Sequence, residues 1–185
     1  MTTGYGGSTA LVVDASVLQS AGETKHPVSS ACREFLERMP QAGLSVISTP
    51  ELKEERNRHA SRYSSRWFSN MVATKRMVYV SAPTDSTLRA HLEQCAEQRA
   101  ENSAQEANLY VALTKDACLI EASNACDKAP IGSLDDRMRA HFRACADLVP
   151  EIEGVVWVNP ANADEAALAW LDTGAPKEPE RMLAP

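Results

Sequence analysis

Ala10-Leu-Val-Val13, closed directly by Asp14, is the stretch that decides the fold, because a short apolar run of this kind suits a strand buried in a parallel sheet. Similar apolar runs recur over residues 44–48, 77–80, 131–134 and 155–158. The segments between these runs carry apolar residues at helical spacing. Strands that alternate with helices predict an α/β fold, here a three-layer α/β/α sandwich with a central, mainly parallel sheet.

Capping residues predict where several helices begin. Thr84 is expected to cap one helix, and a second is expected over residues 106–113. A separate helix is expected to start near Asp116, which places that acid in a first turn. The pattern Asn162-x-x-Glu165 is typical of a capping box and predicts a last helix ending near residue 171.

The length and composition predict one domain that buries a largely aliphatic core. The chain has 185 residues, of which 44% are hydrophobic but few are aromatic. We expect a flexible N-terminus over residues 1–9, the domain proper over 10–160, and a C-terminal helix with an extended tail over 161–185. The start lacks the pattern of a signal peptide, and no apolar run approaches the length of a membrane span. These features predict a cytoplasmic protein that makes no membrane contact.

The five cysteines show no C-x-x-C spacing and lie beside apolar residues on predicted helices. Buried, reduced thiols that pack as small hydrophobic side chains are the expected state of all five. They are Cys32, Cys95, Cys118, Cys126 and Cys145.

Charge is unevenly distributed along the chain. The net charge is -6, yet residues 53–76 hold seven basic and two acidic residues, a net of +5, which leaves -11 for the rest. Residues 147–185 alone carry -6. The basic stretch predicts phosphate contacts by Arg56, Arg62 and Arg66, while the alternative is a solvated face paired with nearby acids.

Acidic residues follow the predicted strands at the ends where parallel α/β sheets place their ligand sites. Packed carboxylates repel one another unless a cation neutralises them, and oxygen ligands without His or Cys suit Mg²⁺ or Mn²⁺. The sequence therefore predicts a metal site. Its expected ligands are Asp14, Glu54, Asp116, Asp135 and Asp136, with Glu51 and Glu55 as alternatives for the middle acid and Asp136 as the alternative to Asp135.

Four short motifs over residues 10–145 resemble, in order, those of the PIN-domain family of metal-dependent ribonucleases. An aspartate closes the first strand with a hydroxyl residue two positions later, and further acids follow in the family's sequence. The motifs are Asp14-Ala-Ser16, Thr49-x-x-Leu52-x-Glu54, Lys115-Asp116, and Ser133-Leu-Asp135-Asp136.

The resemblance implies a PIN-like fold and an Mg²⁺- or Mn²⁺-dependent endoribonuclease that hydrolyses single-stranded or structured RNA. Its catalytic acids would be Asp14, Glu54, Asp116 and Asp135. Ser16 and Ser133 would be hydrogen-bond donors that support these ligands and not nucleophiles, since neither has a histidine partner. The family includes toxins held by a small antitoxin protein as well as RNA-processing enzymes. Both roles, and a homodimer, remain open.

Other interpretations of the same residues give different functions. A non-catalytic RNA- or protein-binding module could keep the fold with a weakened site. Phosphatases of the haloacid-dehalogenase type also begin with a strand that ends in Asp, but they carry a second Asp where this chain has Ser16. Taken singly, each acid has a plain structural role; Glu54, for example, could pair with Arg58 one helical turn later.

Overall fold

The protein folds around a five-stranded sheet in which every strand pair is parallel. The computed structural model describes residues 9–81, 83–100 and 107–185. The predicted flexible segment 1–9 thus lies outside the described residues, except for Thr9. The spatial strand order is β3-β2-β1-β4-β5. The strands are β1 Ala10–Val13, β2 Ser45–Ser48, β3 Met77–Tyr79, β4 Ile131–Gly132 and β5 Trp157–Val158.

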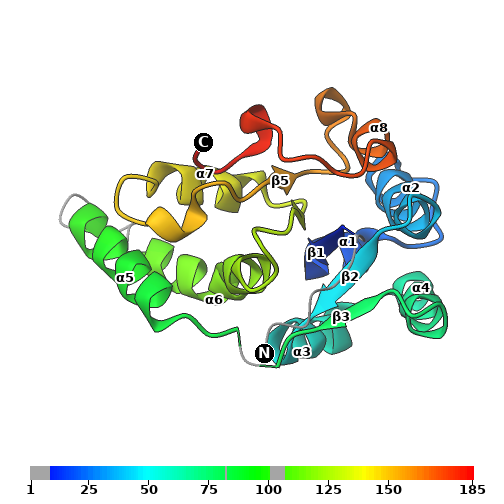
Figure 1. The fold of residues 1–185 in the computed structure, drawn as a ribbon, viewed down its shortest axis with the longest axis horizontal. Helices are drawn as coiled ribbons and strands as arrows, with labels where there is room; N and C mark the ends of the chain where they lie inside the picture. The colour runs from blue at the N-terminus through cyan, green and yellow to red at the C-terminus, as the bar shows by residue number, and fades with distance from the viewer. Residues whose placement is uncertain (1–8, 82, 101–106) are drawn as a thin grey trace.

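Helices connect the strands and account for most of the remaining described chain (Figure 1). Within the described ranges, no helix is long and apolar enough to cross a lipid bilayer. The α-helices are α1 Ala15–Ser20, α2 Pro27–Gln41, α3 Pro50–His59, α4 Arg62–Ala73, α5 Ser86–Ala100, α6 Ala107–Asn124, α7 Asp136–Ala144 and α8 Ala167–Asp172. Three short 3-10 turns are η1 Pro150–Ile152, η2 Ala163–Glu165 and η3 Pro179–Arg181.

Two hydrophobic cores lie on opposite faces of the sheet. Successive strand residues alternate between the cores, so that Leu11 and Val13 pack on one side and Val12 on the other. Helices α5, α6 and α7 cover the Val12 face, while α1, α2, α4 and α8 cover the opposite face (Figure 1). The predicted α/β class with a parallel sheet is therefore confirmed, and the arrangement is compatible with three layers.

The strand order places a topological switch point between β1 and β4. From β1 the chain first builds the sheet outward through β2 and β3, and it then returns to add β4 and β5 on the other side of β1. Connections leave β1 and β4 in opposite directions, and sheets of this kind bind their ligands at the carboxyl ends of the strands at such a point. Asp14 follows β1, and Ser133 follows β4, at this edge.

Two predicted helix starts were wrong. Residues 107–124 form the single helix α6, so Asp116 lies in the middle of a helix and not in a first turn. No glycine or proline interrupts this segment, and helix formation continues through the polar residues before Asp116. Helix α5 is capped by Asp85 and not by Thr84, because Asp85 Oδ1 accepts hydrogen bonds from the backbone N–H groups of Thr87 and Leu88 at 2.9 and 3.1 Å.

The C-terminal segment is more closely packed than an extended tail. Asn162 caps only the short turn η2, because Ala166 adopts a left-handed conformation with φ of 42° that separates η2 from α8. Beyond α8 the chain returns to the sheet, where Leu183 N donates to Val155 O at 2.8 Å and the Leu183 side chain is buried. Burial of Leu183 and the pairing of its backbone hold this segment against the rest of the fold.

The expected reduced state of all five cysteines was wrong for two of them. Cys95 of α5 and Cys145 at the end of α7 form a disulfide, with their Cα atoms 6.1 Å apart. The two residues are 50 positions apart in sequence, so only the packing of α5 near α7 brings them within bonding distance. Cys32 and Cys118 are free and buried as predicted, and Cys126 is free and partly buried.

Candidate functional site

Asp14 is held in place by two serine hydroxyl groups at the switch point. It lies between β1 and α1, at the N-cap position of that helix. Ser16 Oγ and Ser133 Oγ both donate hydrogen bonds to Asp14 Oδ2, the latter at 2.8 Å. Among the described residues, no hydrogen bond reaches Asp14 Oδ1. The carboxylate is therefore oriented through one oxygen, with hydroxyl donors from both strand ends.

The same two serines join the loop after β4 to the loop after β1. Ser16 Oγ accepts from the backbone N–H of Leu134 at 3.1 Å, and Ser133 Oγ accepts from the N–H of Asp135 at 3.1 Å. Each hydroxyl thus binds a backbone donor of the β4–α7 loop while donating to Asp14. This network fixes the position of Asp135 relative to Asp14, although the two residues are far apart in sequence.

Asp135 and Asp136 differ in what they contact. Asp135 caps α7, because its Oδ1 accepts from the backbone N–H of Met138 at 2.7 Å. Asp136 Oδ2 instead accepts from Asn159 Nδ2 at 2.7 Å and so ties α7 to the chain after β5. Of the two, Asp135 is the acid whose charge acts on Asp116. Asp135 is thus coupled electrostatically to Asp116, while Asp136 is hydrogen-bonded to Asn159.

Asp116 projects from α6, which packs against β1, α3 and α7. The pKa of its carboxyl group is raised to about 6, first by burial and then by the charges of Asp14, Asp135 and Glu55, against a lowering by Lys115. The ordinary pKa of such a group is near 3.8, so the environment of Asp116 destabilises the ionised form. The electrostatic coupling shows that acids from β1, α3, α6 and the β4–α7 loop share one region.

On α3, the acid whose charge acts on Asp116 is Glu55, one of the two alternatives to Glu54. Glu54 is largely exposed and binds Arg58 Nη2 through Oε2 at 3.1 Å, the alternative pairing expected from the sequence. The Glu55 side chain is only 25% exposed and acts electrostatically on Asp116. The third candidate, Glu51, has a buried Oε2 atom with no hydrogen-bond partner among the described residues.

Helical spacing explains this sorting of acids along α3. The first turn is fixed by Thr49, whose hydroxyl accepts from the N–H of Leu52 at 3.2 Å. Residues 51 and 55 are four apart and so lie on the same side of α3, a helix that packs against α1 and α6. Glu54 is rotated away from that side by about 100° relative to Glu55. The helical spacing groups Glu51 with Glu55, but only the packing partners of α3 decide which side of the helix faces the other acids.

The donor set of this region suits a hard cation. Asp14, Glu55, Asp116 and Asp135 offer only carboxylate oxygens, which are the ligands that Mg²⁺ and Mn²⁺ prefer. A cation would also relieve the mutual repulsion that raises the Asp116 pKa. In the described part of the chain, no group of three acidic, His or Cys side chains is already arranged at metal-ligand spacing. The match between these residues and a Mg²⁺ or Mn²⁺ ion therefore rests on the chemistry of their oxygen donors and on their electrostatic coupling.

The basic stretch does not form one surface. Arg56 extends over the ring of Phe68, with its guanidinium carbon 4.3 Å from the ring centroid, and lines a cavity beside α3. Arg66 forms an exposed ion pair with Glu23 and lines a separate groove beside α2. Arg62 is exposed at the first position of α4. Arg56 and Arg66 thus line different cavities, while Arg62 lies one helical turn before Arg66 on α4.

Comparison of the chain with models of protein families, with curated proteins and with solved structures finds no match. The residues and their arrangement therefore carry the functional argument.

Proposed function

We propose that this chain is a metal-dependent endoribonuclease of the PIN-domain type. The observation that carries the proposal is the convergence of Asp14, Asp116, Asp135 and Glu55 at the carboxyl edge of the sheet, beside the switch point between β1 and β4. Acids from four separate segments meet where doubly wound sheets bind their ligands. A purely structural role would not require four carboxylates to accept the resulting repulsion.

Each of these residues has a distinct part in the proposed chemistry. Asp14 would be the central ligand, because Ser16 and Ser133 fix one of its oxygens. Asp135 is held by its bond to the N–H of Met138, and Asp116 and Glu55 supply further carboxylates from α6 and α3. A bound Mg²⁺ or Mn²⁺ would activate a water molecule and stabilise the charge that develops on the phosphodiester.

Metal dependence is the experiment that tests the proposal. Cleavage of mixed-sequence RNA, both single-stranded and hairpin, is expected with Mg²⁺ or Mn²⁺ and is expected to stop when EDTA is added. The metal should also raise the melting temperature, by about 5–10 °C at a hundredfold excess over Kd, because it binds the folded cluster and not the unfolded chain. Calorimetry and gel-based cleavage measure the two effects on the same preparation.

Three outcomes of this experiment distinguish the candidate functions. Metal-dependent stabilisation without cleavage of any RNA would identify a non-catalytic module. Hydrolysis of p-nitrophenyl phosphate without cleavage of RNA would identify a phosphatase. Full RNA cleavage by protein shown to be metal-free by elemental analysis would overturn the proposed mechanism.

A matched pair of variants tests the choice of middle acid. Glu55→Gln is expected to lower the cleavage rate by on the order of 10²-fold, because it removes a carboxylate that faces Asp116. Glu54→Gln should leave the rate within about twofold, because it loses only an exposed ion pair with Arg58. Initial rates at saturating Mn²⁺ measure both. A loss confined to Glu54→Gln would restore the assignment made from the sequence.

A further inference from the structure

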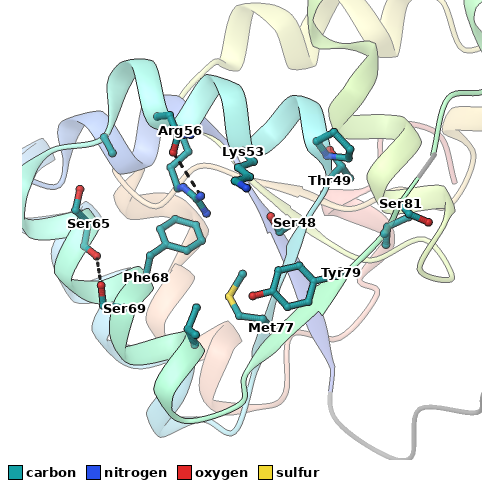
Figure 2. A pocket seen from close by; sticks show the side chains of 15 residues that line it. Ser48, Thr49, Lys53, Arg56, Ser65, Phe68, Ser69, Met77, Tyr79 and Ser81 are labelled. Atoms are coloured by element: carbon teal, nitrogen blue, oxygen red, sulfur yellow. Dashed lines mark hydrogen bonds between the residues drawn. The ribbon is translucent and has the colours of Figure 1, made fainter.

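A cavity of about 780 Å³ lies between α3, α4 and β3 (Figure 2). Its volume falls in the range typical of small-ligand sites. From α3, the cavity is lined by Lys53, Arg56, Asn57 and Ala60, whose spacing places them along one helical face. This is a different face from the one that holds Glu51 and Glu55.

The lining of this cavity has one sign of charge and two aromatic rings. Lys53 and Arg56 supply the cations, and none of the described residues that line it is acidic. Figure 2 shows the rings of Phe68 and Tyr79 on opposite walls, with Arg56 reaching toward Phe68. Serine and threonine hydroxyl groups make up much of the remaining polar lining.

Tyr79 is a largely exposed aromatic residue. Its side chain is on the edge strand β3 and the residue is 68% exposed. Val72, on the α4 wall of the same cavity, is also exposed, at 53%. Among the described residues, two of the three exposed large hydrophobic residues therefore line this cavity. Exposed apolar groups that gather in one cavity mark a binding surface.

We infer that this cavity is a subsite for one unpaired nucleotide of an RNA strand, with the base stacked on Tyr79 and the adjoining phosphate held by Lys53 and Arg56. The inference rests on the proposed function and extends it to the path of the substrate. Bases of any sequence stack on aromatic side chains, and cations bind the phosphates without reading sequence. A peptide added to edge strand β3 is the competing occupant, but it would not require two cations and two facing rings.

The position of the cavity relative to the acids supports this path. Among the lining residues, Ser48 ends β2 and Thr49 follows it, while Val80 and Ser81 follow β3, so the cavity opens at the carboxyl edge of the sheet. Asp14 lies at the same edge beside β1. Two strand spacings separate β1 from β3, a distance of about 10 Å. An RNA strand that follows this edge would place an unpaired base in the cavity close to the phosphate facing Asp14.

Binding of a labelled, unstructured RNA octamer in Ca²⁺ tests the inference without cleavage. Tyr79→Ala is expected to weaken binding by about 10-fold or more, while Tyr79→Phe keeps the ring and should stay within about twofold of the wild type. Val111→Ala is the matched control, because Val111 is similarly exposed, at 67%, but lies on α6 away from the cavity. Lys53→Gln should reduce the slope of log affinity against log salt by about one.

The outcomes separate this inference from the proposed nuclease activity. If RNA is cleaved but Tyr79→Ala changes neither KM nor affinity, the cavity is not on the substrate path and the nuclease proposal stands. If no RNA is cleaved but binding still depends on Tyr79, the nuclease proposal fails and the nucleotide site stands. Equal loss of duplex and single-stranded RNA binding, or binding of a competing acidic peptide in place of RNA, would overturn the inference.

Discussion

Replacing Asp14 with asparagine is expected to lower RNA cleavage by about 10³-fold while the fold is retained. The amide keeps the shape of the carboxylate, and its oxygen can still accept from the hydroxyl groups of Ser16 and Ser133. The variant loses the negative charge that a metal ion would bind at the switch point. Initial rates at saturating Mn²⁺ and thermal melting, measured together, separate the loss of chemistry from a loss of structure.

Asp127→Asn is the matched control for this variant. The Asp127 side chain is fully exposed, and the same chemical change there should leave cleavage unaltered. Cleavage by Asp14→Asn at the wild-type rate, in the same metal and with the same RNA, would contradict a catalytic role for Asp14. A large fall in the melting temperature would show instead that its bonds to the two serines are chiefly structural.

Asp116→Asn is expected to move activity and stability in opposite directions. Cleavage should fall by on the order of 10²–10³-fold, because a metal-facing carboxylate is lost. The metal-free variant should nevertheless be more stable than the wild type at pH 7.5, by about 1–3 kcal/mol after allowance for partial solvent screening. The reason is that burial and the neighbouring acids disfavour the ionised form of Asp116, and asparagine carries no charge.

The pH dependence of stability provides the check. The pKa of Asp116 is about 6 in the folded chain, above its ordinary value of 3.8, so the folded state holds the proton more tightly. The stabilising contribution of that proton is fully present below about pH 4 and is lost as the pH rises through about 6. Urea unfolding in EDTA from pH 4 to pH 8 should show that the free energies of unfolding of the two proteins are most similar at pH 4 and differ by a constant, maximal amount above about pH 6.5. A constant difference across this range would contradict the electrostatic explanation.

The helix predictions show where local sequence was sufficient and where it was not. Thr49 and Pro50 sit at the start of α3 as their residue types favour, because a hydroxyl cap and a proline in the first turn act within a few residues. The start predicted at Asp116 failed, since an acid in a first turn and an acid in mid-helix look alike when no breaker precedes them. The helix predicted to begin at Asn162 is interrupted at Ala166, because that residue adopts a left-handed backbone conformation.

The sequence predicted which acidic residues belong to the candidate site, but it did not predict how their side chains are oriented. Asp14 and Asp135 follow strands whose carboxyl ends meet at one edge, so their proximity follows from the sheet itself. Glu55 could not be separated from Glu54, because both lie on the same short helix and only the packing of α3 against α1 and α6 determines which one is turned inward. The cavity beside Tyr79 carried no local pattern, since its walls come from three separate elements.

The sequence by itself determined the α/β class, the parallel sheet and the two strand ends that carry Asp14 and Asp135. The spacing of apolar residues and the positions of turns depend on residues close together in the chain, so they can be predicted from the sequence alone. Only the tertiary structure decided that Glu55 acts on Asp116, that Cys95 and Cys145 form a disulfide, and that Arg56 and Arg66 line separate cavities. Each of these depends on how helices rotate and pack against partners distant in the chain, and side-chain direction at such contacts is set by packing and not by sequence spacing alone.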